Sequence, residues 1–204
     1  MLGVLSRFDR LAGWGVLACA MAFALGGCAT QPPKNVSAAS RPPDLNLPPD
    51  SLGRRLSLSQ IVTGTFDNQT RSMRFEIEID NNVLVIAGLS HFGATLFVLR
   101  QEGEQITAEA YSDNLYGIDP SWMLFDLKVT YWPAGRLGLA LSQRQMRLED
   151  VPDNGLRRVY GPGERLVMEV HYLDGFLTPG QISITHFDRP YRLFINAIEP
   201  GKNS

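Results

Sequence analysis

The sequence predicts a mainly β domain in which about ten antiparallel strands curl into a barrel or half-barrel, with one or two helices as an insertion. Beyond residue 56 the chain runs in short segments of alternating apolar and polar residues, and Asn, Asp, Gly and Pro separate these segments. One stretch, residues 119–132, repeats apolar residues at helical spacing instead. A meander of this length curls to protect its edges, and two packed sheets are the structural alternative.

Residues 1–27 predict a signal peptide. Two arginines precede the uncharged residues 11–25, which at ~1.5 Å per residue are too short to cross the ~30 Å hydrocarbon core of a membrane. The sequence LGGC at residues 25–28 resembles the bacterial lipobox, in which the peptide bond before the cysteine is cut and the cysteine carries the lipid. We therefore expect cleavage between Gly27 and Cys28 and a palmitate-type lipid on Cys28. An ordinary signal peptide with an incidental cysteine is the alternative.

The expected membrane anchor is the lipid, because the chain has no excess of positive charge. Its formal net charge is −2, so we expect neither a polybasic membrane patch nor a nucleic-acid partner. Ala29, rather than Asp, follows the cysteine. By resemblance to bacterial lipoprotein sorting, this residue implies the periplasmic face of the outer membrane, with inner-membrane anchoring as the alternative.

Residues 28–55 predict a lipid-bearing tether. Pro-Pro pairs recur in this segment among Ser, Ala, Asn and Asp, and bulky apolar side chains are few. Such a segment buries too little surface to offset its ordering entropy, so an extended linker is expected. The alternative is that Leu45, Leu47 and Leu52 pack onto the domain as a strap. The folded half-barrel domain is then expected over residues 56–204.

Two hairpins are predicted in the first half of this domain. Met73, Phe75, Ile77 and Ile79 alternate with charged residues, which is typical of a half-buried antiparallel strand. The first hairpin is expected to pair residues 73–80 with 83–89, and the second to pair residues 94–100 with 105–111. The SHFG sequence at residues 90–93 is expected to form the loop between the two hairpins.

A helix is predicted to begin at Asp119-Pro120 and to be limited by Trp132-Pro133, because Asp is a favoured N-cap and a proline restricts the residue before it. Mainly Asp126, Lys128 and Thr130 are polar in this stretch, so the helix must be covered on most sides. The apolar residues at three- and four-residue spacing, expected to form a lid helix, are Trp122, Phe125, Val129 and Trp132.

A shorter helical turn is predicted around residues 134–141. With about ten strands in total, the helical insertion is expected between the fifth and sixth strands. Turns that contain Pro, Gly and Asp then separate the remaining strands. These strands are expected at residues 146–151, 156–160, 164–173, 181–187 and 191–199.

Dispersed segments of the domain resemble a known family. They are Gly64-Thr65-Phe66, residues 89–97, Leu124-Phe125-Asp126-Leu127 with Trp132-Pro133, and Tyr191-Arg192-Leu193. Over about residues 56–199 the chain resembles a bacterial outer-membrane lipoprotein family of unknown function, associated with aryl polyene biosynthesis clusters and similar to the LolA/LolB class of lipoprotein carriers. The resemblance implies a half-barrel whose apolar cavity holds an acyl or polyene ligand under a helical lid. It also implies a loop residue, here Phe92, that contacts the membrane.

No catalytic site, metal site or cofactor is predicted. His91, His171 and His186 lack the spacing of a zinc site, and no serine, cysteine or carboxylate pair forms a catalytic motif. The leading hypothesis is a non-catalytic, lipid-anchored lipoprotein that binds or accepts a hydrophobic ligand. The alternatives are a structural or assembly lipoprotein that docks an envelope protein and an enzyme that acts on acyl chains.

Overall fold

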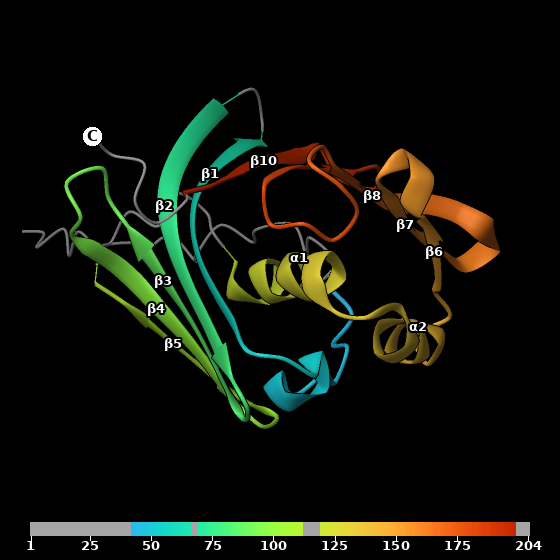
Figure 1. The fold of residues 1–204 in the computed structure, drawn as a ribbon, viewed down its shortest axis with the longest axis horizontal. Helices are drawn as coiled ribbons and strands as arrows, with labels where there is room; N and C mark the ends of the chain where they lie inside the picture. The colour runs from blue at the N-terminus through green and yellow to red at the C-terminus, as the bar shows by residue number, and fades with distance from the viewer. Residues whose placement is uncertain (1–41, 67–68, 112–118, 199–204) are drawn as a thin grey trace, which may run out of the picture. The chain divides into compact units, whose positions relative to one another are not determined.

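The computed structural model describes residues 42–66, 69–111 and 119–198 (Figure 1). The chain divides into two compact units, Met1–Ala39 and Ser40–Ser204, and all described residues lie in the second unit. The expected signal peptide, its cleavage site at Gly27 and Cys28, and the first part of the tether lie outside the described residues. Within the described ranges, no helix is long and apolar enough to cross a membrane.

Ten strands form one antiparallel sheet. Five come before the helices and five after them: β1 (Leu56–Phe66), β2 (Gln69–Asp80), β3 (Val83–Leu89), β4 (Thr95–Glu102), β5 (Gln105–Ala110), β6 (Arg147–Val151), β7 (Leu156–Gly161), β8 (Arg165–Tyr172), β9 (Gln181–His186) and β10 (Tyr191–Ala197). In space their order is β5-β4-β3-β2-β1-β10-β9-β8-β7-β6. The predicted strands are therefore present, and their ends differ from the expected ones by a few residues.

The first and last strands are neighbours at the centre of the sheet. β1 and β10 pair antiparallel, with Val62 opposite Ile195, and so join one meander of β1 to β5 to another of β6 to β10. β5 and β6 are opposite edges of the sheet, so the sheet stays open, and it curves around the first helix (Figure 1). The mainly β half-barrel with a helical insertion is confirmed, and the two-sheet sandwich is wrong.

One face of the sheet is apolar across most of its strands, because residues that lie opposite each other in register share a face. We call it the concave face. On β2, Phe75 and Ile77 belong to it and are buried, whereas Glu76 between them points to the other face. Phe75 lies opposite Gly88, which lies opposite Phe97. A Cβ at Gly88 would overlap the ring of Phe97, so glycine lets this ring lie across β3.

The helices are α1 (Pro120–Tyr131) and α2 (Ala134–Ser142), close to the predicted ranges. α1 begins as expected, because the carboxylate of Asp119 accepts a hydrogen bond from the backbone N–H of Ser121 at 2.8 Å. The helices connect β5 to β6, which are the two edges of the sheet. A connection between opposite edges must cross one face of the sheet, and α1 therefore lies across the concave face (Figure 1).

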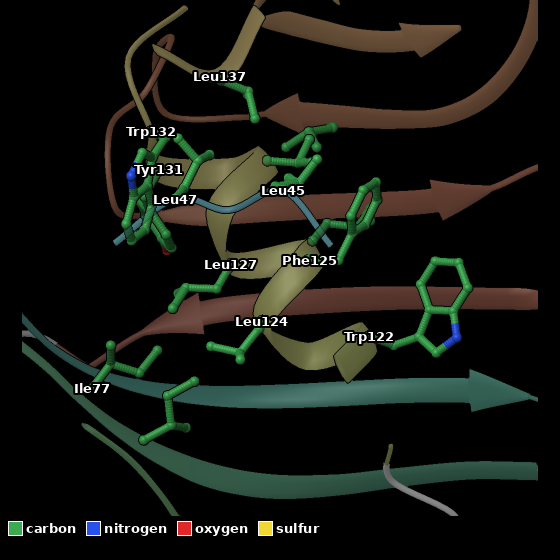
Figure 2. Packing of buried hydrophobic residues seen from close by; sticks show 14 of the residues in the cluster. Leu45, Leu47, Ile77, Trp122, Leu124, Phe125, Leu127, Tyr131, Trp132 and Leu137 are labelled. Carbon is green, nitrogen blue, oxygen red and sulfur yellow. The ribbon is translucent and has the colours of Figure 1, made fainter. Parts of the chain in front are cut away.

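The segment before β1 packs onto the domain. We call residues 44–52 the strap, which ends in the short helix η1 (Pro49–Leu52). Leu45, Leu47 and Leu52 are only 3%, 5% and 2% exposed and belong to the buried core. Figure 2 shows the first two of them beside α1. The expectation of an unpacked tether as far as residue 55 is corrected here, because three leucines bury enough apolar surface to offset the ordering of a short segment.

Polar contacts fix the strap in place. The indole N–H of Trp132 donates a hydrogen bond to the hydroxyl of Ser51 at 2.8 Å. The amide of Gln101 donates to the carbonyl of Leu47 at 3.1 Å, and the guanidinium of Arg144 donates to the carbonyl of Asp44 at 2.9 Å. The strap is thus bonded to β4, to the residue that follows α1, and to the residues that follow α2. Two further short helices, η2 (Pro152–Asn154) and η3 (Pro162–Glu164), only connect strands.

Candidate functional site

The concave face and the helix that fills it are the candidate functional site. In Figure 2 the side chains of Leu124 and Leu127 extend from α1 toward the side of the sheet where Ile77 of β2 lies. Trp122 lies at the start of the helix. A helix that is apolar all round must be covered all round. The buried residues of α1 are Trp122, Leu124, Phe125, Asp126, Leu127, Lys128, Val129, Thr130 and Tyr131, and Trp132 follows, also buried.

The four residues expected in a lid helix are therefore all buried in the core. They are Trp122, Phe125, Val129 and Trp132. Asp126, Lys128 and Thr130, the main polar residues of this helix, are buried as well, so the helix is covered on all sides and not only on most of them. α1 fills the concave face as a wedge, and each of these polar side chains must find its partners inside the protein.

The C-terminal end of α1 is held by a buried arginine. Arg157 on β7 is 0% exposed, and its guanidinium donates hydrogen bonds to the carbonyls of Val129 and Trp132 at 2.9 and 2.8 Å. It also forms a two-point ion pair with Asp150, at 2.7 and 2.8 Å. The last carbonyls of a helix lack partners inside the helix and carry its negative dipole end, so the arginine supplies both the donors and the charge.

Two tyrosines add to this end of the helix. The hydroxyl of Tyr172 on β8 donates a hydrogen bond to the carbonyl of Thr130 at 2.6 Å, and the amide of Gln60 on β1 donates to the hydroxyl of Tyr131 at 2.5 Å. Burial raises the pKa of Tyr131 to about 12 and raises that of Tyr172 as well. Both phenols stay neutral at neutral pH, and the hydroxyl of Tyr172 keeps the proton that it donates to Thr130.

A second group of polar side chains lies at the middle of α1. Asp126 and His186 on β9 are both buried, and the His186 Nε2 lies 2.9 Å from the Asp126 Oδ1. Burial raises the pKa of Asp126, and the hydrogen bond with His186 offsets part of that effect. The second carboxylate oxygen of Asp126 is buried and has no hydrogen-bond partner in the described part of the chain. Leaving such an oxygen unpaired costs stability.

Trp122 and Arg189 cover this pair. The ring of Trp122, one helical turn before Asp126, meets His186 edge to face with 5.5 Å between ring centroids. The guanidinium carbon of Arg189, in the turn between β9 and β10, lies 3.2 Å from the centroid of the Trp122 ring. This stacking is an attractive cation–π contact that also shields the ring from water.

Lys128 is a further buried titratable group of α1. It is buried, and burial lowers its pKa to about 8, although the nearby carboxylate of Asp44 in the strap offsets part of the shift. Asp126 and Lys128 are two residues apart on a helix and therefore point in different directions. A helix placed only for stability would carry apolar residues at both positions, since burying charge is costly.

The concave face continues beyond the part that α1 covers. Ile106, Ala108 and Ala110 on β5 lie opposite Gln101, Leu99 and Phe97 on β4, all of which belong to that face. The β4 residues are buried, whereas all six residues of β5 are exposed. A strip of apolar side chains therefore extends the concave face at the β5 edge.

Among the residues that the structure describes, Phe92 is the most exposed of the large apolar side chains, at 99%. It lies in the turn between β3 and β4, where the hydroxyl of Ser90 accepts a hydrogen bond from the N–H of Ala94 at 3.1 Å. Gly93 has a φ of +79°, a conformation that suits glycine. The turn is thus a defined structure that holds the Phe92 ring in water.

The structure does not bring the three histidines together. His91 is exposed in the same turn as Phe92, His171 is exposed on β8, and only His186 is buried. In the described ranges no group of three or more His, Cys, Asp or Glu side chains could hold a metal ion. Sequence reasoning missed the pairing of His186 with Asp126, which are 60 positions apart. A usable signal was the presence of an acid within a helix that is otherwise almost entirely apolar.

Comparison with known proteins gives one family and several similar solved structures. Residues 57–199 match a family described as Protein of unknown function (DUF3261). No curated protein matches the chain. One similar solved structure is described as a candidate outer membrane lipoprotein-sorting protein domain from Vibrio parahaemolyticus, with 8% identity, coverage of 70% of this chain and 83% of that chain, and a TM-score of 0.40. Another is a DUF1329 family protein from Desulfovibrio piger, with 10% identity, coverage of 79% and 92%, and a TM-score of 0.37.

Proposed function

The chain belongs to the DUF3261 family of proteins of unknown function, and we propose that it is a lipoprotein of the outer membrane that binds an acylated or polyene ligand on its concave face. Its lipid anchor is Cys28, exposed after cleavage behind Gly27, and its domain faces the periplasm. One observation carries the ligand proposal: a helix that is almost entirely apolar fills an apolar, curved sheet, yet hydrogen bonds of buried polar side chains hold its middle and its C-terminal end.

The balance of energies supports an exchange of the helix for a ligand. A hydrogen bond in a folded protein contributes only about 0.5–1.5 kcal/mol, because water replaces it when the groups separate. Burial of a 16-carbon chain contributes roughly 10 kcal/mol, at ~0.8 kcal/mol per methylene. This is of the order of the stability of a whole domain. An acyl chain that takes the place of side chains of α1 can therefore offset the loss of their contacts.

The exposed apolar strip on β5 is the place where we propose that the ligand first binds. Ile106, Ala108 and Ala110 provide an apolar surface that already faces water and adjoins the buried Leu99 and Phe97. An acyl chain placed on this strip buries apolar area before α1 moves. The ligand then advances toward the helix along one continuous face.

Catalysis is not part of the proposal. Acyl transfer through a serine or cysteine needs that nucleophile next to a base, and in the described residues His186 is hydrogen-bonded to the buried carboxylate of Asp126 rather than to a hydroxyl or thiol. Asp126 and His186 instead hold α1 to β9. The protein therefore binds or accepts its ligand without changing it.

The experiment is uptake of a fluorescent polyene fatty acid by the full-length, detergent-solubilised protein. We expect saturable binding, and we expect Ala110→Trp to weaken it about tenfold, or ~1.4 kcal/mol, because the indole occupies the strip. Glu109→Trp is the matched control, since residue 109 is exposed on the opposite face of the same strand. Absence of uptake by the unmodified protein, or equal loss in both variants, would count against the proposal.

A further inference from the structure

The two edges of the sheet differ in how they are protected. β6 packs against α2 and carries Arg147, Glu149 and Asp150, and Pro152 follows it directly. Charges, prolines and covering helices are the usual means by which proteins prevent a free edge from pairing with another chain. β5 has the sequence QITAEA, with one charged residue and no proline. β5 is the less protected edge.

The backbone of β5 offers hydrogen bonds outward at alternate residues. The N–H of Tyr111 donates to the carbonyl of Leu96 on β4 at 2.8 Å. In an antiparallel ladder the N–H and C=O of one residue point to the same side, and the side alternates along the strand. Tyr111, Glu109 and Thr107 therefore face β4, and Ile106, Ala108 and Ala110 direct their backbone groups away from the sheet.

We propose that a second copy of this chain pairs along β5, antiparallel, with Ala108 opposite Ala108 of the second copy. In this register Ile106 lies opposite Ala110, and Glu109 lies opposite Thr107. No charged residue of the strand meets a like charge, and the large Ile106 meets a small side chain. A register shifted to place Glu109 opposite itself would bring two carboxylates together.

The pairing also extends the concave face. The twofold axis of an antiparallel strand pair that continues a sheet runs perpendicular to that sheet, so both concave faces lie on the same side. The side chains of Ile106, Ala108 and Ala110 from the two copies then form one apolar strip between the two wedge helices. β5, which is exposed on both of its faces as an edge strand, becomes an interior strand.

The test is disulfide cross-linking of the full-length chain in oxidant-treated cells. A cysteine at Ala108 meets its own counterpart, with Cα atoms about 5.5 Å apart, within the range of a disulfide. We expect Ala108→Cys to give a dimer band at least about ten times stronger than Glu149→Cys on β6. The chain with no added cysteine controls for Cys19 and Cys28. Dimer formation that is no stronger than that of Glu149→Cys overturns the proposal.

The register gives a second, independent criterion. Ile106→Cys alone and Ala110→Cys alone should cross-link weakly, since neither residue faces itself. Co-expression of the two variants should give a strong dimer band, because Ile106 lies opposite Ala110. Equal cross-linking at all three positions indicates random collision and also overturns the proposal. Neither criterion requires a bound ligand, so failure of fatty-acid uptake leaves this result standing.

Discussion

Single buried side chains decide where α1 lies. Arg157 reaches from β7 to two carbonyls at the end of the helix, and its charge is balanced by Asp150. Asp126 and His186 hold the other half of the helix to β9. These residues are far apart in the sequence, so their contacts form only once the sheet is complete. The helix is fixed at the residue scale by polar groups, although most of its buried surface is apolar.

Removal of Arg157 tests this view. Arg157→Ala leaves Asp150 and the carbonyls of Val129 and Trp132 without their partner, so we expect the free energy of unfolding to fall by about 3 to 5 kcal/mol. Urea unfolding monitored by circular dichroism measures it. Arg158→Ala is the control, because Arg158 is partly exposed in its ion pair with Glu169, and the loss there should stay below about 1 kcal/mol. Similar losses in the two variants would show that the Arg157 contacts do not hold the helix.

The pKa of Lys128 predicts how stability depends on pH. Because its pKa is about 8 in the folded protein and 10.5 ordinarily, the unfolded chain binds more protons between these values, and stability should rise with pH from 8 to 10. Lys128→Met should abolish this rise and stabilise the protein at pH 7 by about 1 to 3 kcal/mol.

Urea unfolding of both proteins at pH 7, 8, 9 and 10 gives the comparison. The series stops at pH 10 because the raised pKa of Tyr131, about 12, lowers stability above that pH. There the tyrosine ionises first in the unfolded chain. A parallel pH dependence in the two proteins would be inconsistent with a charged, buried Lys128.

At the scale of elements, the turn between β3 and β4 presents an exposed aromatic side chain that could contact a membrane surface. A hydrogen-bonded turn that holds Phe92 fully in water contributes nothing to the core. We propose that Phe92 enters the membrane surface when a ligand is delivered. The support is its exposure in a defined turn together with the resemblance on which the expectation was based.

Phe92→Glu should slow transfer of a bound fluorescent fatty acid to phospholipid vesicles several-fold while changing the free energy of unfolding by less than about 0.5 kcal/mol. The carboxylate disfavours contact with lipid, and the exposed ring has no packing to lose. Leu139→Glu on α2, also at a well-exposed leucine, serves as the control and should leave the transfer rate unchanged. Unchanged transfer by Phe92→Glu would remove this residue from the proposal.

At the scale of the whole molecule, the strap and the Phe92 turn lie at opposite ends of β4. The strap is bonded to Gln101 near the end of β4, whereas the Phe92 turn leads into Thr95 at its start. The two ends are roughly 20 Å apart at ~3.4 Å per residue. Asp44 lies 16 positions after Cys28, so the tether spans at most about 55 Å. We propose that this reach lets Phe92 turn toward the membrane in which the proposed lipid on Cys28 would be anchored.

Tether length is therefore a testable requirement. Deletion of residues 31–40 leaves a span of about 20 Å, no longer than the distance between the ends of β4, and the Phe92 turn lies beyond the start of that strand, so the turn should no longer meet the same membrane. We expect the shortened protein to stay in the membrane fraction but to lose transfer of ligand to that membrane. Replacement of the same ten residues by Gly and Ser should preserve transfer, since only length matters. Cys28→Ser should release the chain from the membrane fraction in either background.

The sequence by itself determined the local structure. Alternation along 73–80, the Asp119-Pro120 start of α1 and the turns between strands depend on residues a few positions apart, and the structure confirms these elements. From the sequence, the packed strap was only an alternative to an extended tether. Its buried leucines lie among prolines and polar residues that are typical of a linker. The pairing of β1 with β10 and the placing of α1 across the concave face were settled by tertiary structure alone.

The candidate site followed the same division. The apolar residues of α1 could be read from their spacing, but the partners of Asp126 and Arg157 could not, since they come from strands that follow α1 by many residues. Periodicity shows which face of a segment is apolar and carries no information on which distant segment covers it. Those partners reach the helix only because β1 pairs with β10. This pairing joins the two meanders into one sheet and sets the order of the strands that surround α1.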